Sequence, residues 1–254
     1  MKVKIAIKVE EIVHYFGENP VLKGINFSLK EGDVLSIIGP NGSGKSTLIK
    51  IIAGILKPFS GKVIFPFLKK RKINKGKIVS YVPQNPKFFS NFSVEYFLLL
   101  SRYPHRKGFS FSEKDYRIVK EVSNSYKINN LLKRGVNDLS GGELRKVLLS
   151  GAEVQESDII LLDEPDSFLD PSSKKIVSAF IRKLKRNKKT VIFSTHDLSL
   201  VYELSDYFLG LENGEQLVFE KTRKEKLKAY AEKIFRVSFN VFEKDKKLFF
   251  YPDI

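Results

Sequence analysis

A glycine-rich segment holds the first residues whose types and spacing could do chemistry. Residues 39–47 read Gly-Pro-Asn-Gly-Ser-Gly-Lys-Ser-Thr and fit the pattern G-x-x-x-x-G-K-S/T. In such a loop, glycines let backbone N–H groups wrap an anion, and the following helix N-terminus adds positive potential. Lys45 would reach the β- and γ-phosphates of a nucleotide, and Ser46 would ligate Mg²⁺. Rather than a chance glycine-rich turn, we predict a phosphate site made of Gly39, Pro40, Asn41, Gly42, Ser43, Gly44, Lys45, Ser46 and Thr47.

Two adjacent carboxylates follow an apolar run further along the chain. Residues 159–162 read Ile-Ile-Leu-Leu and lead into Asp163 and Glu164. A carboxylate at the C-terminal end of a buried strand lies where open α/β sheets bind their ligands. Asp163 would hold Mg²⁺, directly or through water, and Glu164 would act as general base on an attacking water. Alone, the two carboxylates could equally open a surface turn, but beside a phosphate loop they predict a hydrolytic site.

The segment Leu139-Ser140-Gly141-Gly142-Glu143 has a structural and a functional interpretation. Ser140 and Glu143 fit a capping box, and apolar residues at helical spacing follow as far as Val154. A capped helix whose first turn lacks side chains offers bare N–H groups and a dipole to an anion. Two adjacent glycines cost helix stability, so we expect another group to approach them closely. Both interpretations can hold at once.

The elements that must position these residues follow from hydrophobic patterning. Residues 3–13 and 21–29 alternate apolar and polar side chains, which predicts half-buried antiparallel strands. Residues 34–38, 159–162 and 191–193 are nearly continuous apolar runs, which are typical of a parallel sheet covered on both faces. A buried helix face that stops before a proline at position 58 is expected from Leu48, Ile49, Ile52, Ile55 and Leu56.

The rest of the chain adds helices and a terminal hairpin. Residues 90–155 are mostly helical in pattern, and residues 221–254 predict a helix followed by two strands. We therefore expect an α/β fold with a P-loop NTPase core, an antiparallel β subdomain and an inserted helical subdomain. The expected division is an ATPase domain over 1–220, with the helical insertion at about 88–155, and a C-terminal extension over 221–254.

Composition excludes several classes of protein. The chain of 254 residues has no cysteine, so it forms neither disulfides nor thiolate metal sites. No apolar run approaches the ~18 residues of a membrane-spanning helix, and the alternating N-terminal residues predict a strand rather than a signal peptide, so we expect a cytoplasmic protein. The net charge is +16, but the basic residues are scattered, so no nucleic-acid partner is expected. His14 and His105 lack metal-ligand partners at useful spacing and are interpreted as structural.

Three further segments complete a set of ordered motifs. They are Tyr81-Val82-Pro83-Gln84, Ser167-Phe168-Leu169-Asp170 and Ser194-Thr195-His196-Asp197. With the phosphate loop, the Ser-Gly-Gly segment and the Asp-Glu pair, they make the chain resemble an ATP-binding-cassette (ABC) ATPase over nearly its whole length. In the family's terms, the three segments resemble its Q-loop, D-loop and switch histidine.

The resemblance implies ATP and Mg²⁺ as ligands and a head-to-tail pair of ATPase subunits. Ser140, Gly141 and Gly142 of one subunit would meet the γ-phosphate that Lys45 of the other subunit holds. Gln84 would ligate Mg²⁺ and sense the γ-phosphate, His196 would contact that phosphate and position the water, and Asp170 would complete the nucleotide site. An aromatic residue before the second strand would stack on adenine: Phe16 is the candidate, Tyr15 the alternative, and ordinary packing the other interpretation.

A finer resemblance concerns the helical insertion. The segment Ser101-Arg102-Tyr103-Pro104-His105, followed by a capping box at Ser112 to Asp115, resembles ATPases of iron–siderophore, haem and cobalamin importers. That resemblance implies transmembrane permease subunits on separate chains, an extracytoplasmic substrate-binding protein acting indirectly, and a peripheral position on the inner face of the cell membrane. The paired ATPase subunit could be an identical chain or a different one, and the chain does not identify the cargo.

A soluble ABC ATPase acting on nucleic acid or ribosomes is the alternative, and it fits the basic charge. A single phosphate loop and the absence of sustained heptads favour transport instead. The aromatic density after Gln84, including Phe88, Phe89 and Tyr103, predicts that the insertion contacts the permease. Part of that density is expected to pack the insertion's own core.

Overall fold

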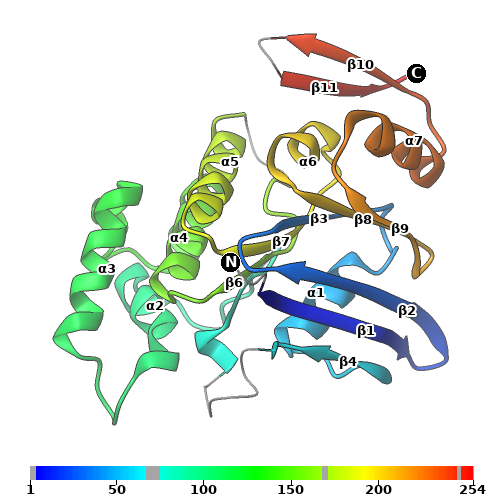
Figure 1. Ribbon diagram of the computed structural model, residues 1–254. Helices are drawn as coiled ribbons and strands as arrows, with labels where there is room; N and C mark the ends of the chain where they lie inside the picture. The colour runs from blue at the N-terminus through cyan, green and yellow to red at the C-terminus, as the bar shows by residue number, and fades with distance from the viewer. Residues whose placement is uncertain (1–3, 67–74, 168–170, 245–246, 254) are drawn as a thin grey trace.

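A six-stranded sheet forms the centre of the computed structural model, which describes residues 4–66, 75–167, 171–244 and 247–253 (Figure 1). Its strand order is β5-β6-β7-β3-β8-β9, parallel except that β9 runs antiparallel to β8. Every residue of β3, β6 and β7 is buried, which confirms the prediction of strands covered on both faces. The strands are β3 (Val34–Ile38), β5 (Val79–Val82), β6 (Ile159–Leu162), β7 (Thr190–Ser194), β8 (Tyr207–Glu212) and β9 (Glu215–Lys221).

An antiparallel sheet of order β2-β1-β4 lies beside it, at the lower right of Figure 1. Its strands are β1 (Ile5–Phe16), β2 (Asn19–Lys30) and β4 (Ser60–Ile64). The first two strands run further toward the turn between them than the predicted 3–13 and 21–29, because β1 continues into a tight turn at Gly17, whose φ is +61°. Inward-facing side chains of this sheet share one apolar core with the central sheet and with the helix between them.

That helix, α1 (Lys45–Ala53), follows the phosphate loop and ends earlier than the apolar periodicity suggests. Gly54 takes a left-handed conformation, and its N–H donates to the carbonyl of Ile51, which terminates the helix. Ile55 consequently lies outside the helix and is 58% exposed, so the prediction that it belongs to the buried face was wrong. Leu56 also lies beyond the helix but remains partly buried against the core.

Three helices form the green region at the left of Figure 1: α2 (Val94–Ser101), α3 (Glu113–Tyr126) and α4 (Gly141–Val154). They enclose a separate apolar core, as the helical pattern predicted. The expected capping box at the start of α3 is present. Arg102, only 2% exposed, ties the three helices together through Asp115 at 2.9 Å and the Val154 carbonyl at 2.6 Å.

The remaining helices cover the sheet and carry the C-terminal segment. Helices α5 (Pro171–Arg186) and α6 (Leu198–Leu204) pack near the face opposite α1, and α7 (Lys224–Phe235) follows the last strand of the sheet. A hairpin of β10 (Phe239–Lys244) and β11 (Lys247–Pro252) then packs against α6 and α7, at the top of Figure 1. Short 3₁₀ segments occupy Lys75–Lys77, Tyr103–His105, Asn129–Leu131 and Val136–Asp138.

Candidate active site

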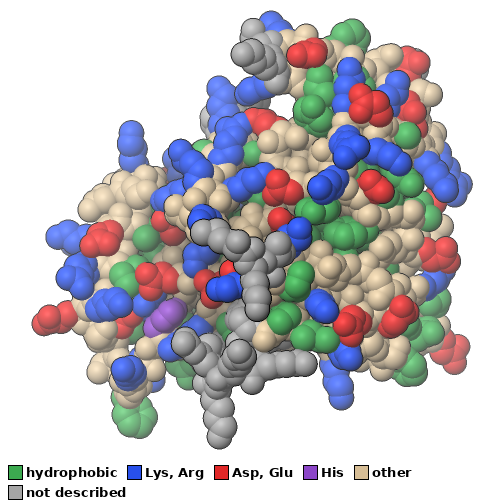
Figure 2. Space-filling model, in the orientation of Figure 1, with side chains coloured by type: hydrophobic (Ala, Val, Ile, Leu, Met, Phe, Trp, Pro, Cys, Tyr) green, Lys and Arg blue, Asp and Glu red, His purple; other side chains and the backbone are tan. Residues whose placement is uncertain are grey.

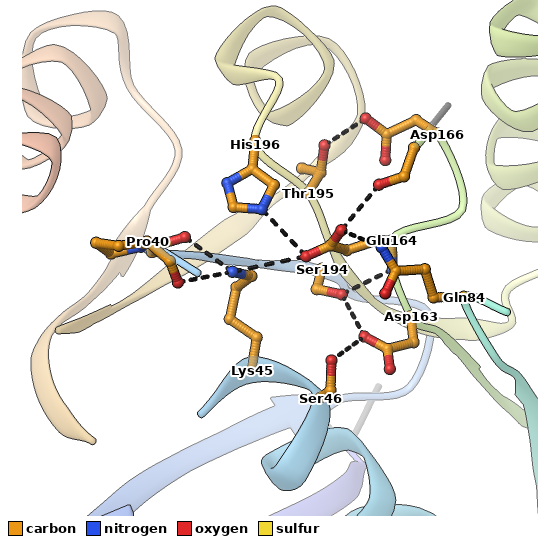
Figure 3. A network of polar contacts seen from close by, with 12 residues as sticks. Pro40, Lys45, Ser46, Gln84, Asp163, Glu164, Asp166, Ser194, Thr195 and His196 are labelled. Atoms are coloured by element: carbon orange, nitrogen blue, oxygen red, sulfur yellow. Dashed lines mark hydrogen bonds and ion pairs between the residues drawn. The ribbon is translucent and has the colours of Figure 1, made fainter. Parts of the chain in front are cut away.

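The carboxyl ends of four neighbouring parallel strands bring the predicted residues to one edge of the central sheet. The phosphate loop follows β3, Asp163 and Glu164 follow β6, and His196 lies two residues beyond β7. Gln84 lies two residues beyond β5. Because the strands are parallel and hydrogen-bonded in register, residues far apart in the sequence meet at this edge (Figure 3).

The phosphate loop needs its glycines for steric reasons. A Cβ atom on Gly39 would lie 2.3 Å from the carbonyl oxygen of Leu211, and one on Gly44 would lie 2.7 Å from the side chain of Leu22. Gly44 also has a φ of +101°, a region that other residues rarely adopt. The loop is therefore fixed closely against the sheet, and helix α1 starts directly behind it.

The ammonium of Lys45 is held inside this loop. Lys45 is 4% exposed, and its Nζ donates to the carbonyls of Gly39 at 2.8 Å and Pro40 at 3.0 Å. Burial lowers the pKa of Lys45, while the charges of Glu164 and Asp163 oppose that shift. The cation is thus desolvated and stands ready for an anion at the mouth of the loop.

Asp163 is the centre of a hydroxyl–carboxylate cluster. Its Oδ1 accepts hydrogen bonds from Ser46 Oγ and Ser194 Oγ, both at 2.9 Å, and the residue is 3% exposed. Hydroxyl and carboxylate oxygens are the ligands that Mg²⁺ prefers. Within the described ranges, no group of three or more His, Cys, Asp or Glu residues could hold a metal. The Ser46 hydroxyl and the Asp163 carboxylate fit a Mg²⁺ that takes its remaining ligands from phosphate and water.

Glu164 is held in a strained and well-defined position. Its φ is +41°, in the left-handed region, and its backbone N–H donates to Ser194 Oγ at 2.8 Å. Its Oε2 accepts from Gln84 Nε2 at 2.6 Å and from Ser167 Oγ at 2.8 Å, and its Oε1 lies 3.1 Å from His196 Nε2. Three side chains therefore hold this carboxylate, and a fourth, that of Ser194, holds its backbone N–H.

The surroundings keep Glu164 ionised. Burial acts to raise its pKa, but the Ser167 hydroxyl and the charges of His196 and Lys45 outweigh that effect and hold the pKa below its ordinary value. A carboxylate at neutral pH can accept a proton from water, which a carboxylic acid cannot do. The arrangement can therefore support base-assisted attack of water on a phosphate held by Lys45.

A cavity of about 480 Å³ opens in front of these groups. Phe16, 52% exposed, lines the cavity, whereas Tyr15 packs edge-on against Phe59 at 5.1 Å between ring centroids. Of the two aromatic candidates, the structure thus brings only Phe16 to the cavity. The complete lining is Phe16, Val21, Asn41, Gly42, Gly44, Lys45, Ser46, Thr47, Gln84 and Glu164.

The Ser-Gly-Gly segment lies apart from this cavity and does not line it within the described chain. It starts α4 with the predicted capping box: Ser140 Oγ accepts from the Glu143 N–H at 3.3 Å, and Glu143 accepts from the Ser140 N–H at 2.9 Å. A Cβ built on Gly141 would meet no described atom within 4 Å, so this helix end faces open space. Asp170, predicted to complete the site, lies outside the described residues, as do Phe168 and Leu169.

Two groups of residues act in the site without having been singled out from the sequence. Ser194 and Ser167 belong to quoted motifs, but their hydroxyls support Asp163 and Glu164 directly. Asp166 and Arg145 lie just behind the site and are both buried. A hydroxyl at the end of a buried strand could have indicated Ser194, because such a group must find a hydrogen-bond partner.

Comparison with known proteins agrees with this geometry. The family described as ABC transporter matches residues 22–167. A zinc import ATP-binding protein of Wolbachia sp. subsp. Brugia malayi is 34% identical over 210 residues, covering 82% of this chain and 80% of that protein. Further relatives are named for iron chelatin transport and for energy-coupling factor transport.

Solved structures extend the likeness to the whole fold. One, described as an inward-facing conformation of a metal-chelate type ABC transporter, has a TM-score of 0.85 at 28% identity and covers 99% of this chain and 98% of its own. Another is a dimeric ATP-binding cassette in a post-hydrolysis state with bound ADP and phosphate, with a TM-score of 0.72 at 26% identity. It covers 85% of this chain and 99% of its own.

Proposed function

The chain belongs to the ABC transporter family as an ATP-binding ATPase, and we propose that two such subunits hydrolyse ATP between them to drive import of a metal chelate. The observation that carries the proposal is the meeting of Lys45, Asp163 and Glu164 at one sheet edge, with Glu164 ionised and fixed by its neighbours. These groups supply a cation that binds phosphate, a carboxylate that binds metal, and a base. Together they are what hydrolysis of a phosphoanhydride needs.

The roles follow from the contacts. Asn41 to Thr47 would wrap the phosphates, and Phe16, which also lines the cavity, would stack on the adenine. Ser46 and Asp163, and Gln84 once it moves from Glu164, would hold Mg²⁺, which when bound neutralises charge on the β- and γ-phosphate oxygens. Glu164 would take the proton of the attacking water, and His196, already 3.1 Å from it, would orient that water and the γ-phosphate.

A second subunit is proposed because one chain leaves the site open. Space is open at the first turn of α4, where a Cβ on Gly141 would meet no described atom within 4 Å, yet this helix end does not line the chain's own cavity within the described residues. Ser140 Oγ accepts from a backbone N–H, so its own proton remains available for a phosphate oxygen. A head-to-tail pair would bring this helix end to the γ-phosphate held by the other subunit. The dimeric state of the ADP-bound relative supports this arrangement.

Import of a metal chelate is supported by the likeness that covers 99% of the chain, including the C-terminal helix and hairpin. The relatives are named for several different cargoes, so their names leave the cargo class open. No helix of the described chain is long and apolar enough to cross a membrane. We propose a peripheral position on the inner face of the membrane, held by permease subunits that work with an extracytoplasmic binding protein.

The permease contact is proposed to lie on the helical region. Phe89, Tyr96 and Tyr103 are large apolar side chains at its surface, and Phe89 is fully exposed. Phe88 instead packs edge-on against Phe92 and Phe97 inside the region. Of the aromatics predicted for this surface, Phe89 and Tyr103 therefore stay candidates, whereas Phe88 is partly buried and packs against the core.

The alternative function, a soluble ATPase acting on nucleic acid or ribosomes, is supported only by the net charge of +16. On the face of the molecule that Figure 2 shows, Lys and Arg side chains are interspersed with acidic and apolar ones and form no continuous basic stripe. Reconstituting the chain with co-purifying membrane proteins in vesicles tests the two functions. ATP-driven uptake of an iron–siderophore, haem or cobalamin is expected. ATPase activity stimulated by ribosomes or nucleic acid, with no membrane partner, would contradict import.

A further inference from the structure

Two buried charged side chains just behind the active site each carry an unpartnered polar atom. Arg145 lies on α4 and Asp166 lies two residues beyond Glu164, and each is 7% exposed. Arg145 Nη1 and Asp166 Oδ1 are fully enclosed and find no hydrogen-bond partner in the described structure. A buried charged group without a partner costs free energy, so such atoms need a reason.

Arg145 acts on the Gln84 side of the candidate base. Its Nη2 donates to the backbone carbonyl of Gln84 at 3.2 Å. The side chain of the same Gln84 donates to Glu164 Oε2 at 2.6 Å. Arg145 belongs to α4, the helix that Ser140 caps, so a single intermediate residue, Gln84, links this helix to Glu164.

Asp166 acts on the opposite side. Its Oδ2 accepts from Thr195 Oγ1 at 2.7 Å, a contact drawn in Figure 3. The same Thr195 oxygen accepts from the Asp197 N–H at 3.0 Å and so shapes the turn that presents His196 to Glu164. Asp166 thus helps to orient His196 beside Glu164, as Arg145 helps to orient Gln84 on the other side of the same carboxylate.

The two charges also act on each other. The negative charge of Asp166 stabilises the Arg145 guanidinium against the effect of its burial. Among the ion pairs within the described ranges, however, none joins the two residues directly. A direct contact between the two side chains would satisfy both unpartnered atoms, because a guanidinium and a carboxylate form a charge-assisted pair.

We propose that Arg145 and Asp166 are a buried positioning pair that ties the start of α4 to the two side chains touching Glu164. The proposal rests on the head-to-tail pairing above, in which the partner's nucleotide binds at the start of α4. Binding there would shift Arg145 toward Asp166 and so align Gln84 and His196 around Glu164. Each subunit's base would then respond to the nucleotide that its own signature segment completes.

The test compares ATP binding with turnover in the full-length chain. Arg145→Met and Asp166→Asn each remove one charge, and Arg145→Lys keeps the charge but shortens the reach to the Gln84 carbonyl. Arg117→Met, an exposed arginine on α3, is the matched control. Neither Arg145 nor Asp166 lines the described cavity, so the Kd for ATP should stay within about twofold of the wild-type value. Turnover should fall by up to ~10²-fold because the base is misplaced, with kcat and kcat/KM falling together.

The double variant Arg145→Met/Asp166→Asn separates a working pair from two independent residues. Each single change leaves the other charge buried and unpaired, so the double variant should be no slower than the slower single variant. If the loss of turnover in the double variant equals the product of the two single losses, the two residues act independently, and the proposed pairing is wrong. Normal kcat in folded Arg145→Lys and Asp166→Asn would overturn the positioning role, and these two mild changes keep the test valid if Arg145→Met fails to fold. Wild-type protein without ATPase activity would instead refute the proposed function.

Discussion

Lys45 Nζ lies 3.7 Å from Glu164 Oε1, so the phosphate-loop cation and the candidate base face each other directly (Figure 3). Lys45 also donates to two carbonyls of its own loop, and Glu164 accepts from Gln84 and Ser167. In this arrangement each group neutralises the other. A γ-phosphate entering between them would take over Lys45 and release Glu164 toward water, which couples substrate binding to the availability of the base.

Lys45→Ala should abolish tight ATP binding. The loop then loses the buried ammonium that faces the β- and γ-phosphates, and a small side chain cannot replace its charge. Fluorescent-ATP titration measures the loss, and circular dichroism verifies the fold. Lys50→Ala, on the same helix outside the cavity, is the control and should bind normally. Wild-type affinity and turnover in Lys45→Ala would refute the phosphate-loop assignment.

Mixing two inactive variants should restore hydrolysis. Ser140→Arg blocks the start of α4, and Lys45→Ala disables the phosphate loop, so each variant alone should be inactive. In a mixed head-to-tail pair both lesions fall on one site and the other site stays intact. Residual ATPase activity should therefore appear in the mixture. If the two sites are strictly coupled, mixed pairs should still retain one bound nucleotide, and mixed pairs that retain none would contradict the composite site.

Acid should weaken the helical region through Asp115. Burial alone would raise the pKa of Asp115, but hydrogen bonds from Ser112 and Arg102 outweigh it and lower the pKa from 3.8 to about 2. A depressed folded-state pKa means that this stabilisation, roughly 2 kcal/mol, is fully present above pH 4 and is lost as the pH falls toward 2. Urea unfolding should show Asp115→Asn destabilised at pH 7, with the difference from wild type shrinking in acid.

The control for this prediction is Glu113→Gln, an exposed carboxylate in the same first helical turn. Its difference from wild type should be small at every pH. A difference for Asp115→Asn that stays constant between pH 7 and pH 2 would show that the ionised carboxylate adds no stability.

The effect of an aromatic substitution in the helical region should depend on whether the side chain is exposed or packed. Phe89→Ser and Tyr103→Ser change exposed side chains, so basal ATPase activity should persist while co-purification with the membrane partner is lost. Phe88→Ser should destabilise the protein, by less than the ~3–5 kcal/mol that a fully buried Phe→Ala change costs. Membrane binding and transport at the normal rate in the first two variants would place the permease contact elsewhere.

Much of the site could be predicted from the sequence because its signals are local. The loop around Lys45 has its own spacing, and Asp163 with Glu164 comes directly after an apolar run that is typical of a buried strand. A parallel sheet then brings strand ends together without further information. The capping box at Ser140 was likewise predictable, since it depends on two side chains three residues apart.

Other features depend on contacts between distant parts of the chain. Asp166 and Arg145 are 21 positions apart, and no sequence pattern near either residue indicates that it is buried. Phe88 and Phe89 are adjacent and identical, yet one packs inside and the other is exposed, because tertiary packing decides which ring turns inward. Ile55 continued the helical spacing, but the left-handed Gly54 ended the helix before it.

The most direct test of a base acting within an ATP-bridged pair is the behaviour of Glu164→Gln. The amide keeps the size and hydrogen-bonding reach of the side chain but cannot accept the water proton, so turnover should fall by ~10²–10⁴-fold. ATP should still bind, and size-exclusion chromatography with ATP and Mg²⁺ should show a stable dimer that is absent without nucleotide. A Glu164→Gln protein that stays monomeric with ATP and hydrolyses it at the wild-type rate would contradict the account.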